Sequence, residues 1–268
     1  MNNEKLLVSL SGDGVKRITF NQPEKRNSVD AEMTEKLFDA MRESATDGTR
    51  VIILTGAGGA FCAGADLAAR GEAEIAEYDV TKYLQEIVNP TILVMRSLPV
   101  PIIARVHGHA VGIGCNFALA ADMIVASEEA LFGQVFVRIG LIPDGGGTFF
   151  LPEMVGYHKA FELISLGDII DAREAERIGI VNRVVPFAEL DETVEKLARR
   201  FIDSPRTALE KIKTALNRNI HSPLAEALEF EAAAQDECFH SADFIEGVKA
   251  FLEKRKAVFN QSSKNAGA

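Results

Sequence analysis

Two glycine-rich segments, each following a short apolar run, constrain the fold most. The runs VIILTG (51–56) and PIIARV (101–106) read as buried strands, and the glycine-rich segments 56–67 and 107–122 continue from them. Glycine leaves no side chain between backbone and ligand, and the first amides of a following helix have no partner inside it. Each segment could be a tight turn only, but two in succession favour an α/β core whose turns aim backbone N–H groups at one ligand.

The pattern before and after these segments predicts helices around the core. Ser28 is positioned to cap a helix that carries Met33, Leu37 and Met41 on one face and runs up to Gly48. From about residue 145 the pattern is helical, and the stretch IVNRVV is the single predicted strand there.

The end of the chain predicts a separate helical region. The last helix is expected to start at Ser241 and to carry a one-sided apolar stripe, Phe244, Val248, Phe251 and Leu252. Such a stripe needs a surface to bury against, either on the core or on a neighbouring subunit. We therefore expect a core over residues 1–200 and a C-terminal helical region over 201–268.

Composition argues against several classes of protein. The chain of 268 residues has a formal net charge of -10, which disfavours a nucleic-acid partner because phosphate backbones require clustered Lys and Arg. The first residues are charged where a secretory signal needs an apolar run, and no segment approaches the ~20 apolar residues of a membrane span. We expect a cytoplasmic protein without a membrane partner.

Motifs for nucleotides, metals and thiol chemistry are incomplete. Neither glycine-rich segment fits the phosphate-binding pattern G-x-x-x-x-G-K-[ST] or the dinucleotide pattern G-x-G-x-x-G. The three cysteines form no C-x-x-C pair, so neither a disulfide framework nor a zinc site is expected. His107 and His109 lack a third ligand, and Cys115 lacks a base, so packed side chains are the simpler interpretation. No metal site is predicted.

Six segments in order along the chain resemble the crotonase superfamily, the enoyl-CoA hydratase/isomerase fold. They are NQPEKRNSV (21–29), FCAGADL (61–67), ARVHGHAVGIGCNFALAAD (104–122), LFG (131–133), GLIPDGGGTFFLPEMVG (140–156) and DAREAERIGIVNRVV (171–185). The segment GIGCNFALAAD, followed by RIGLIPDGGGTFFLP, is most similar to sequences of the phenylacetate-pathway epoxide and enoyl-CoA isomerases.

The resemblance implies a spiral of β-β-α units, C-terminal helices that trimerise, and a homotrimer or a dimer of trimers. It also implies an acyl-CoA substrate whose thioester oxygen is held by the amides of Ala63 and Ile113. Coenzyme A would be part of the substrate, with no resident cofactor. The substrate-binding positions that the resemblance implies are Lys25, Arg26, Ala65, Asp66, Leu67, Gly112, Asn116 and Phe136. Lys25 and Arg26 would contact the phosphates, unless they are ordinary surface charges.

Carboxylates decide which reaction the resemblance favours. Family hydratases generally use two glutamates, and the corresponding positions here are Asn116 and Phe136, neither of which can act as a base. Asp144 becomes the candidate acid/base, at the position of the catalytic aspartate in the isomerases. A double-bond shift removes one proton and returns one, so a single carboxylate can serve both steps. Phe132, Phe136, Ile139 and Leu141 would raise the pKa of Asp144 if they surround it.

Three alternatives stay open. Pro-Asp-Gly is a favoured turn sequence, so Asp144 could cap the helix that begins near Thr148. A hydratase or hydrolase would hold its water with Asp144 and Asn116. In any of these enzymes, Glu72, Glu74 or Glu77 is a separate candidate for a second acid in the site. A binding or scaffolding trimer without catalysis is the third. The leading prediction is an acyl-CoA isomerase acting on a double bond or an epoxide, in which the two amides stabilise an enolate and Asp144 moves the proton.

Overall fold

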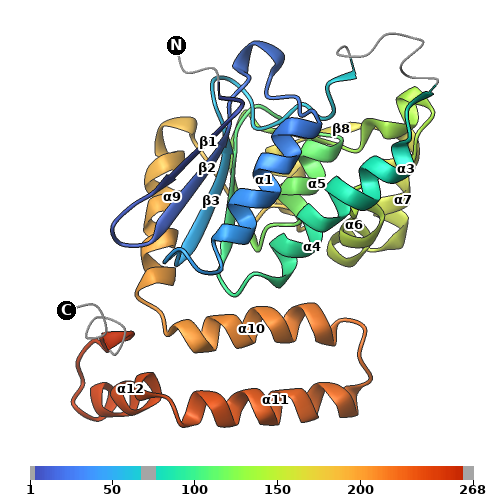
Figure 1. The fold of residues 1–268 in the computed structure, drawn as a ribbon. Coiled ribbons are helices and arrows are strands. Elements are labelled where there is room, and N and C mark those ends of the chain that lie inside the picture. The colour runs from blue at the N-terminus through green and yellow to red at the C-terminus, as the bar shows by residue number, and fades with distance from the viewer. Residues whose placement is uncertain (1–3, 68–76, 262–268) are drawn as a thin grey trace.

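The computed structural model describes residues 4–67 and 77–261 and is centred on a six-stranded sheet (Figure 1). In spatial order the strands are β1 (Leu6–Leu10), β2 (Val15–Phe20), β3 (Val51–Gly56), β4 (Ile102–Val106), β6 (Met123–Ser127) and β9 (Arg183–Val185). Strands β1 and β2 form an antiparallel hairpin, and the later neighbours are parallel. Parallel neighbours need long crossover connections, and these carry the helices and the glycine-rich segments.

A second, three-stranded sheet lies at the glycine-rich end of the core. It contains β5 (His109–Val111), β7 (Leu131–Gly133) and β8 (Ile169–Asp171) in that order. Strands β5 and β7 are parallel, and β7 and β8 are antiparallel. The prediction of one strand after residue 145 is wrong, because β8 adds to β9. Three residues that pair along one edge are too few to produce a periodic signal.

Helices surround both sheets. In the first half of the chain they are η1 (Pro23–Lys25), α1 (Ala31–Glu43), α3 (Val80–Tyr83), η3 (Leu84–Val88), α4 (Asn89–Ser97) and α5 (Ile113–Leu119). In the second half they are η4 (Val135–Ile139), α6 (Gly147–Val155), α7 (Tyr157–Leu166), α8 (Ala172–Arg177), α9 (Phe187–Ile202), α10 (Arg206–Asn219), α11 (Leu224–Phe239) and α12 (Ala242–Leu252). The predicted α/β class with a C-terminal helical region is confirmed.

Strand alternation divides the core into two layers. Along β3, Ile52 and Leu54 join the larger cluster with α1, α4 and α5, whereas Val51 and Ile53 face the opposite side of the sheet. That opposite side is covered by the apolar stripe of α9, which buries Leu190, Val194, Leu197 and Ala198.

Side-chain caps set several helix starts. The predicted cap Ser28 is wrong: Asp30 caps α1, and its carboxylate accepts from the N–H of Met33. The helix ends at Glu43 rather than near Gly48. The predicted Ser241 cap is confirmed, since its hydroxyl accepts from the N–H of Phe244 at 3.1 Å.

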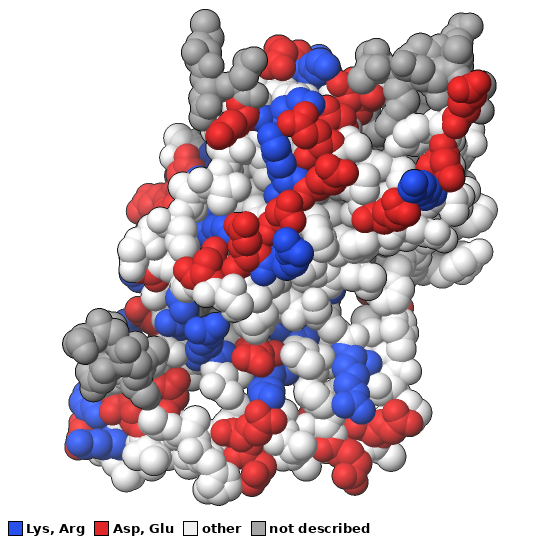
Figure 2. Space-filling view, in the orientation of Figure 1, with Lys and Arg blue, Asp and Glu red and all other residues white. Residues whose placement is uncertain are grey.

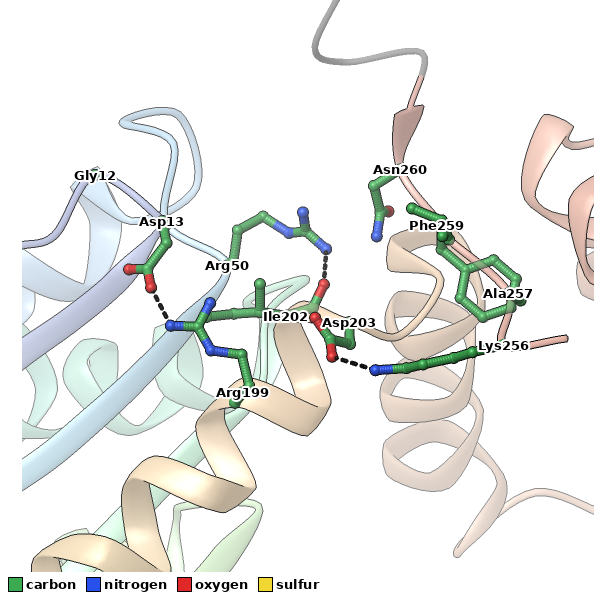
Figure 3. A pocket seen from close by; sticks show the side chains of 11 residues that line it. Gly12, Asp13, Arg50, Arg199, Ile202, Asp203, Lys256, Ala257, Phe259 and Asn260 are labelled. Atoms are coloured by element: carbon green, nitrogen blue, oxygen red, sulfur yellow. Dashed lines mark hydrogen bonds and ion pairs between the residues drawn. The ribbon is translucent and has the colours of Figure 1, made fainter.

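The helices α10, α11 and α12 lie together as a layer below the core (Figure 1). The segment after α12 returns to the end of α9, where Lys256 pairs with Asp203 at 3.0 Å (Figure 3). A cavity of about 460 Å³ lies between them. Of the cations that line it, Arg199 and Lys256 are paired with carboxylates and Arg50 donates to the carbonyl of Ile202 at 3.2 Å, so we interpret the cavity as a packing junction.

Lys213 joins α10 to the core through a buried ammonium. Its Nζ donates to the carbonyls of Met95 and Val100, both at 3.0 Å, and to the carboxylate of Asp122 at 2.8 Å. Asp122 lies just beyond α5 and also accepts from the N–H of Ile102. Burial lowers the pKa of Lys213, because it disfavours the charged form. The three acceptors offset part of the free energy that is lost when the ammonium is removed from water.

We expect Lys213→Met to destabilise the fold by about 2–4 kcal/mol, because the substitution removes the ammonium that donates to two carbonyls and takes one of its cationic partners from the Asp122 carboxylate. Urea denaturation measures the effect. Lys211→Ala is the control, since Lys211 on the same helix pairs with the exposed Glu237 and should cost at most about 1 kcal/mol. Equal costs for the two variants would contradict this view of the junction.

Candidate active site

The two glycine-rich segments meet in space. Residues 61–66 run beside β5: the N–H of Cys62 donates to the carbonyl of His109 at 2.8 Å, and the N–H of Val111 donates back to Cys62 at 3.0 Å. Gly64 has φ +102, and a Cβ there would lie 3.0 Å from the carbonyl oxygen of Val111. Both the backbone angle and the close approach therefore require glycine at this position.

Two backbone amides are left without acceptors at this meeting point. Ile113 begins α5, and its N–H has no acceptor among the residues that the structure describes. The same holds within that part of the chain for Ala65, which is exposed beside Gly64. Ala63, predicted to be the second donor, is already engaged, because its N–H donates to the carbonyl of Arg26 at 3.0 Å. Both residues line the pocket described below, and the donor role of either amide stays a prediction.

Asp144 lies at the same place, on the loop before α6. A pocket of about 170 Å³ is lined by Ala63, Gly64, Ala65, Leu67, Gly112, Ile113, Val135, Phe136, Ile139, Leu141 and Asp144. The glycines after Asp144 bring this loop against α5: a Cβ on Gly145 would lie 2.2 Å from Cδ1 of Ile113. The candidate acid and the amide of Ile113 are therefore brought together by backbone packing.

One oxygen of the Asp144 carboxyl group is shielded from water. Its Oδ1 is buried and has no hydrogen-bond partner among the described residues. Burial raises the pKa of Asp144 to about 6, in the range where a carboxyl group can both accept and return a proton. Of the four residues predicted to surround it, Phe136, Ile139 and Leu141 line the pocket, whereas Phe132 is buried in the core.

The side chain of Asp144 does not cap α6. The helix begins at Gly147 without any side-chain cap, and the contact from Asp144 is made by its backbone carbonyl, which accepts from the N–H of Gly147 at 3.1 Å. The backbone carbonyl of Asp144 therefore makes the turn before α6, and its side chain is not used for capping and lines the pocket.

Asn116 is fully buried and already bonded at both ends of its amide. Its Nδ2 donates to the backbone carbonyl of Asp144 at 2.7 Å, and its Oδ1 accepts from Nε2 of Gln134 at 2.6 Å. It does not line the pocket. Gln134 was not singled out from the sequence, although it stands directly after the LFG segment that helped to carry the resemblance.

The basic residues predicted to contact phosphates lie at the rim of this region. Lys25 donates to the buried carboxylate of Asp66 at 2.7 Å, so part of its charge is neutralised. Arg26 has an exposed side chain and no ion-pair partner in the described part of the chain. Leu67 and Gly112 line the pocket, as does Phe136.

The remaining candidates do not reach the pocket. Glu72 and Glu74 lie outside the described residues, and Glu77 is exposed and not among the lining residues. His107 is packed: its Nε2 donates to the carbonyl of Gly58 while Nδ1 accepts from Arg105, both at 2.9 Å. Burial raises the pKa of the Cys115 thiol to about 12, which leaves it unreactive.

The comparison with protein families agrees with this arrangement. The family model for enoyl-CoA hydratase/isomerase matches residues 11–262, which includes both glycine-rich segments and Asp144. The chain belongs to the enoyl-CoA hydratase/isomerase family. The resemblance to the crotonase superfamily is thereby confirmed.

Individual members of the enoyl-CoA hydratase/isomerase family differ in the reaction that their names state. The chain is 38% identical over 247 residues to a probable enoyl-CoA hydratase of Rhodobacter capsulatus, covering 92% of this chain and 95% of the relative. It is 37% identical over 257 residues to 1,2-epoxyphenylacetyl-CoA isomerase of Escherichia coli, and the match covers 95% of this chain and 98% of the relative. The crystal structure of enoyl-CoA hydratase from Bacillus anthracis is similar to this chain, with a TM-score of 0.88 and 33% sequence identity. The match covers 96% of this chain and 99% of that chain.

The raised pKa of Asp144 predicts a stability gain in Asp144→Asn. With a folded-state pKa near 6 against an ordinary value of 3.8, the ionised carboxylate costs stability that grows as pH rises through this window. Asparagine removes the charge, so the variant should be more stable by about 2–3 kcal/mol at pH 8 and by almost nothing at pH 4. Denaturant unfolding at both pH values measures this, and a gain that is the same at both would contradict a buried, titrating carboxylate.

Proposed function

We propose that this protein is an acyl-CoA isomerase that shifts a double bond, or rearranges an epoxide, next to a thioester, with Asp144 as its single acid/base. The observation that carries the proposal is one largely buried carboxylate in a small pocket that is also lined by Ala65 and Ile113, whose N–H groups have no acceptor in the described part of the chain. This combination suits a reaction that builds charge on one oxygen and moves one proton.

In the proposed reaction the Asp144 carboxylate removes a proton from the carbon α or γ to the thioester carbonyl. The electron pair of that C–H bond moves into the conjugated system, and the negative charge develops on the thioester oxygen. The N–H groups of Ala65 and Ile113 donate to that oxygen as the charge forms, and one such donor is typically worth about 2.7–4 kcal/mol of barrier height. Protonated Asp144 then returns the proton to the other end of the system.

Water addition is less well supported by the same residues. A hydratase needs a group that activates water in addition to one that protonates carbon, and Phe136 occupies one of the two positions where family hydratases carry glutamate. At the other position Asn116 is buried and bonded at both ends, so its amide is not turned toward a pocket water. A hydrolase that holds water between Asp144 and Asn116 meets the same difficulty. A non-catalytic trimer would not need a buried carboxyl group with a raised pKa.

The proposed substrate is an acyl-CoA thioester, with Arg26 and Lys25 at the rim for its phosphates. Coenzyme A enters as part of the substrate, and the proton transfer requires no resident cofactor. The part of the chain that the structure describes contains no group of three or more His, Cys, Asp or Glu that could hold a metal ion. No helix in the described residues is long and apolar enough to cross a membrane. We further propose a cytoplasmic location without a nucleic-acid partner; charges of both signs are mixed over α1 (Figure 2).

Assembly into a homotrimer or a dimer of trimers is part of the same proposal. The C-terminal helices carry large apolar side chains that the single chain leaves exposed: Leu216, Leu224, Leu228, Ile245, Phe251 and Leu252. Soluble chains rarely leave so many apolar groups exposed in one region, which supports burial against further copies.

Asp144→Asn should abolish double-bond migration. We expect a fall of about 10²–10⁴-fold in the rate of 3-enoyl-CoA to 2-enoyl-CoA conversion, because asparagine cannot accept the proton. Mass spectrometry separates the unchanged mass of migration from the added water of hydration, so both reactions are followed in one assay.

Glu153→Gln is the matched control for this assay, since it neutralises an exposed carboxylate on the helix that follows Asp144. It should leave migration within about twofold of the parent protein. Hydration by the parent and by Asp144→Asn at equal rates, without migration, would contradict the proposal and indicate a base elsewhere.

Phe251→Asp should weaken assembly, because it places a charge on a side chain that is 82% exposed in the single chain and lies on the proposed interface. Light scattering after size exclusion should give a trimer or hexamer for the parent and a shift toward monomer for the variant. Glu253→Gln, two residues away, is the control. A monomeric parent protein would overturn the proposed assembly without affecting the proposed chemistry.

A further inference from the structure

Asp144 is held in place through its backbone. Its side chain is bonded to no other side chain in the described residues, and Oδ1 in particular has no partner. The position of the carboxylate therefore depends on the orientation of the peptide that carries it. One side chain bonds to that peptide, Asn116, whose Nδ2 donates to the Asp144 carbonyl at 2.7 Å.

The orientation of the Asn116 amide is fixed by Gln134. A backbone carbonyl can only accept, so Asn116 must turn its Nδ2 toward Asp144 and its Oδ1 toward Gln134. Gln134 meets that requirement by donating from Nε2 to Oδ1 at 2.6 Å. Both amide side chains are almost wholly buried, at 0% and 3% exposed, so water cannot replace either bond easily.

We propose that Gln134 is a positioning residue for the reaction, acting on Asp144 through the chain Gln134 to Asn116 to the Asp144 carbonyl. It does not line the pocket that we assign to the substrate. This inference rests on the proposed role of Asp144 and deepens it by naming what holds the carboxylate. The surrounding backbone supports it, because a Cβ on Gly147 would lie 2.8 Å from both amide atoms of Asn116.

The loss of Gln134 has a defined consequence in this arrangement. Without its donor, the Asn116 amide can rotate and present its oxygen to the Asp144 carbonyl, where two acceptors repel. The loop 144–147 then loosens and water reaches the carboxylate. The expected signature is a lower kcat with little change in KM, together with an acid limb of kcat that moves to lower pH as the carboxyl group becomes better hydrated.

The test compares Gln134→Leu, Asn116→Leu, the double variant and Asp144→Asn in the 3-enoyl-CoA migration assay. Gln134→Leu should lower kcat about 10–100-fold with KM within about threefold. The double variant should be about as slow as Asn116→Leu alone, because both substitutions interrupt one chain of hydrogen bonds. Ser44→Ala removes one buried hydrogen bond at the end of α1 and should lower stability without changing kcat.

The outcomes separate this inference from the proposed function. Migration that persists in Asp144→Asn would overturn the role of Asp144 and this proposal with it. Loss of migration in Asp144→Asn with an unchanged kcat and acid limb in Gln134→Leu would overturn the positioning role alone. Losses that multiply in the double variant would also overturn it, because they would mean that Gln134 and Asn116 act separately. If Gln134→Leu does not fold, Gln134→Met, which keeps a similar length, is compared in its place and should show the same loss, because a thioether has no hydrogen to donate to Asn116.

Discussion

The close approach of the loop 144–147 to the start of α5 is the contact on which the candidate site depends. Three consecutive glycines allow it, because a methyl group at Gly145 or Gly147 would overlap Ile113 or Asn116. The same approach buries one carboxylate oxygen of Asp144 and brings that residue to the pocket that Ile113 also lines. A packing requirement and a chemical requirement are therefore met by one set of backbone contacts.

The second amide comes from a different part of the chain by the same kind of approach. Gly64 lies against the carbonyl of Val111, so the segment that contains Ala65 is seated against the turn that precedes α5. The site is thus assembled from three loops around one short helix. Backbone hydrogen bonds join the segment 61–66 to β5, and the buried amide of Asn116 joins α5 to the loop 144–147. Among the described residues that line the pocket, Asp144 is the one carboxylate.

Much of this arrangement could be predicted from the sequence, and the features that could not be predicted depend on contacts between distant segments. The strands VIILTG and PIIARV and the glycine turns were predictable, because apolar runs and glycine clusters are local signals. Asp144 was singled out through the resemblance, and its catalytic role stays a prediction. The hydrogen bond of the Ala63 amide was not predictable, since its acceptor is the carbonyl of Arg26, which lies 37 residues earlier in the chain. The Ser28 cap failed for a smaller reason: Asp30 two residues later reaches the same kind of backbone N–H. Gln134 could not be found from its sequence neighbours, because its hydrogen bond to Asn116 joins residues that are 18 positions apart.

The helix α9 has a consequence for the order in which the chain can fold. It covers a face of the sheet built from Val51, Ile53, Ile103 and Val125, all of which precede it by more than sixty positions. Its end also joins the first hairpin, where Arg199 pairs with Asp13 across a sequence separation of 186 residues. A nascent chain that has reached only the glycine-rich loops therefore holds a sheet with one bare apolar face. Synthesis of these loops precedes synthesis of the helix that covers the sheet, so this protein completes its core late, when nearly three quarters of its length has emerged.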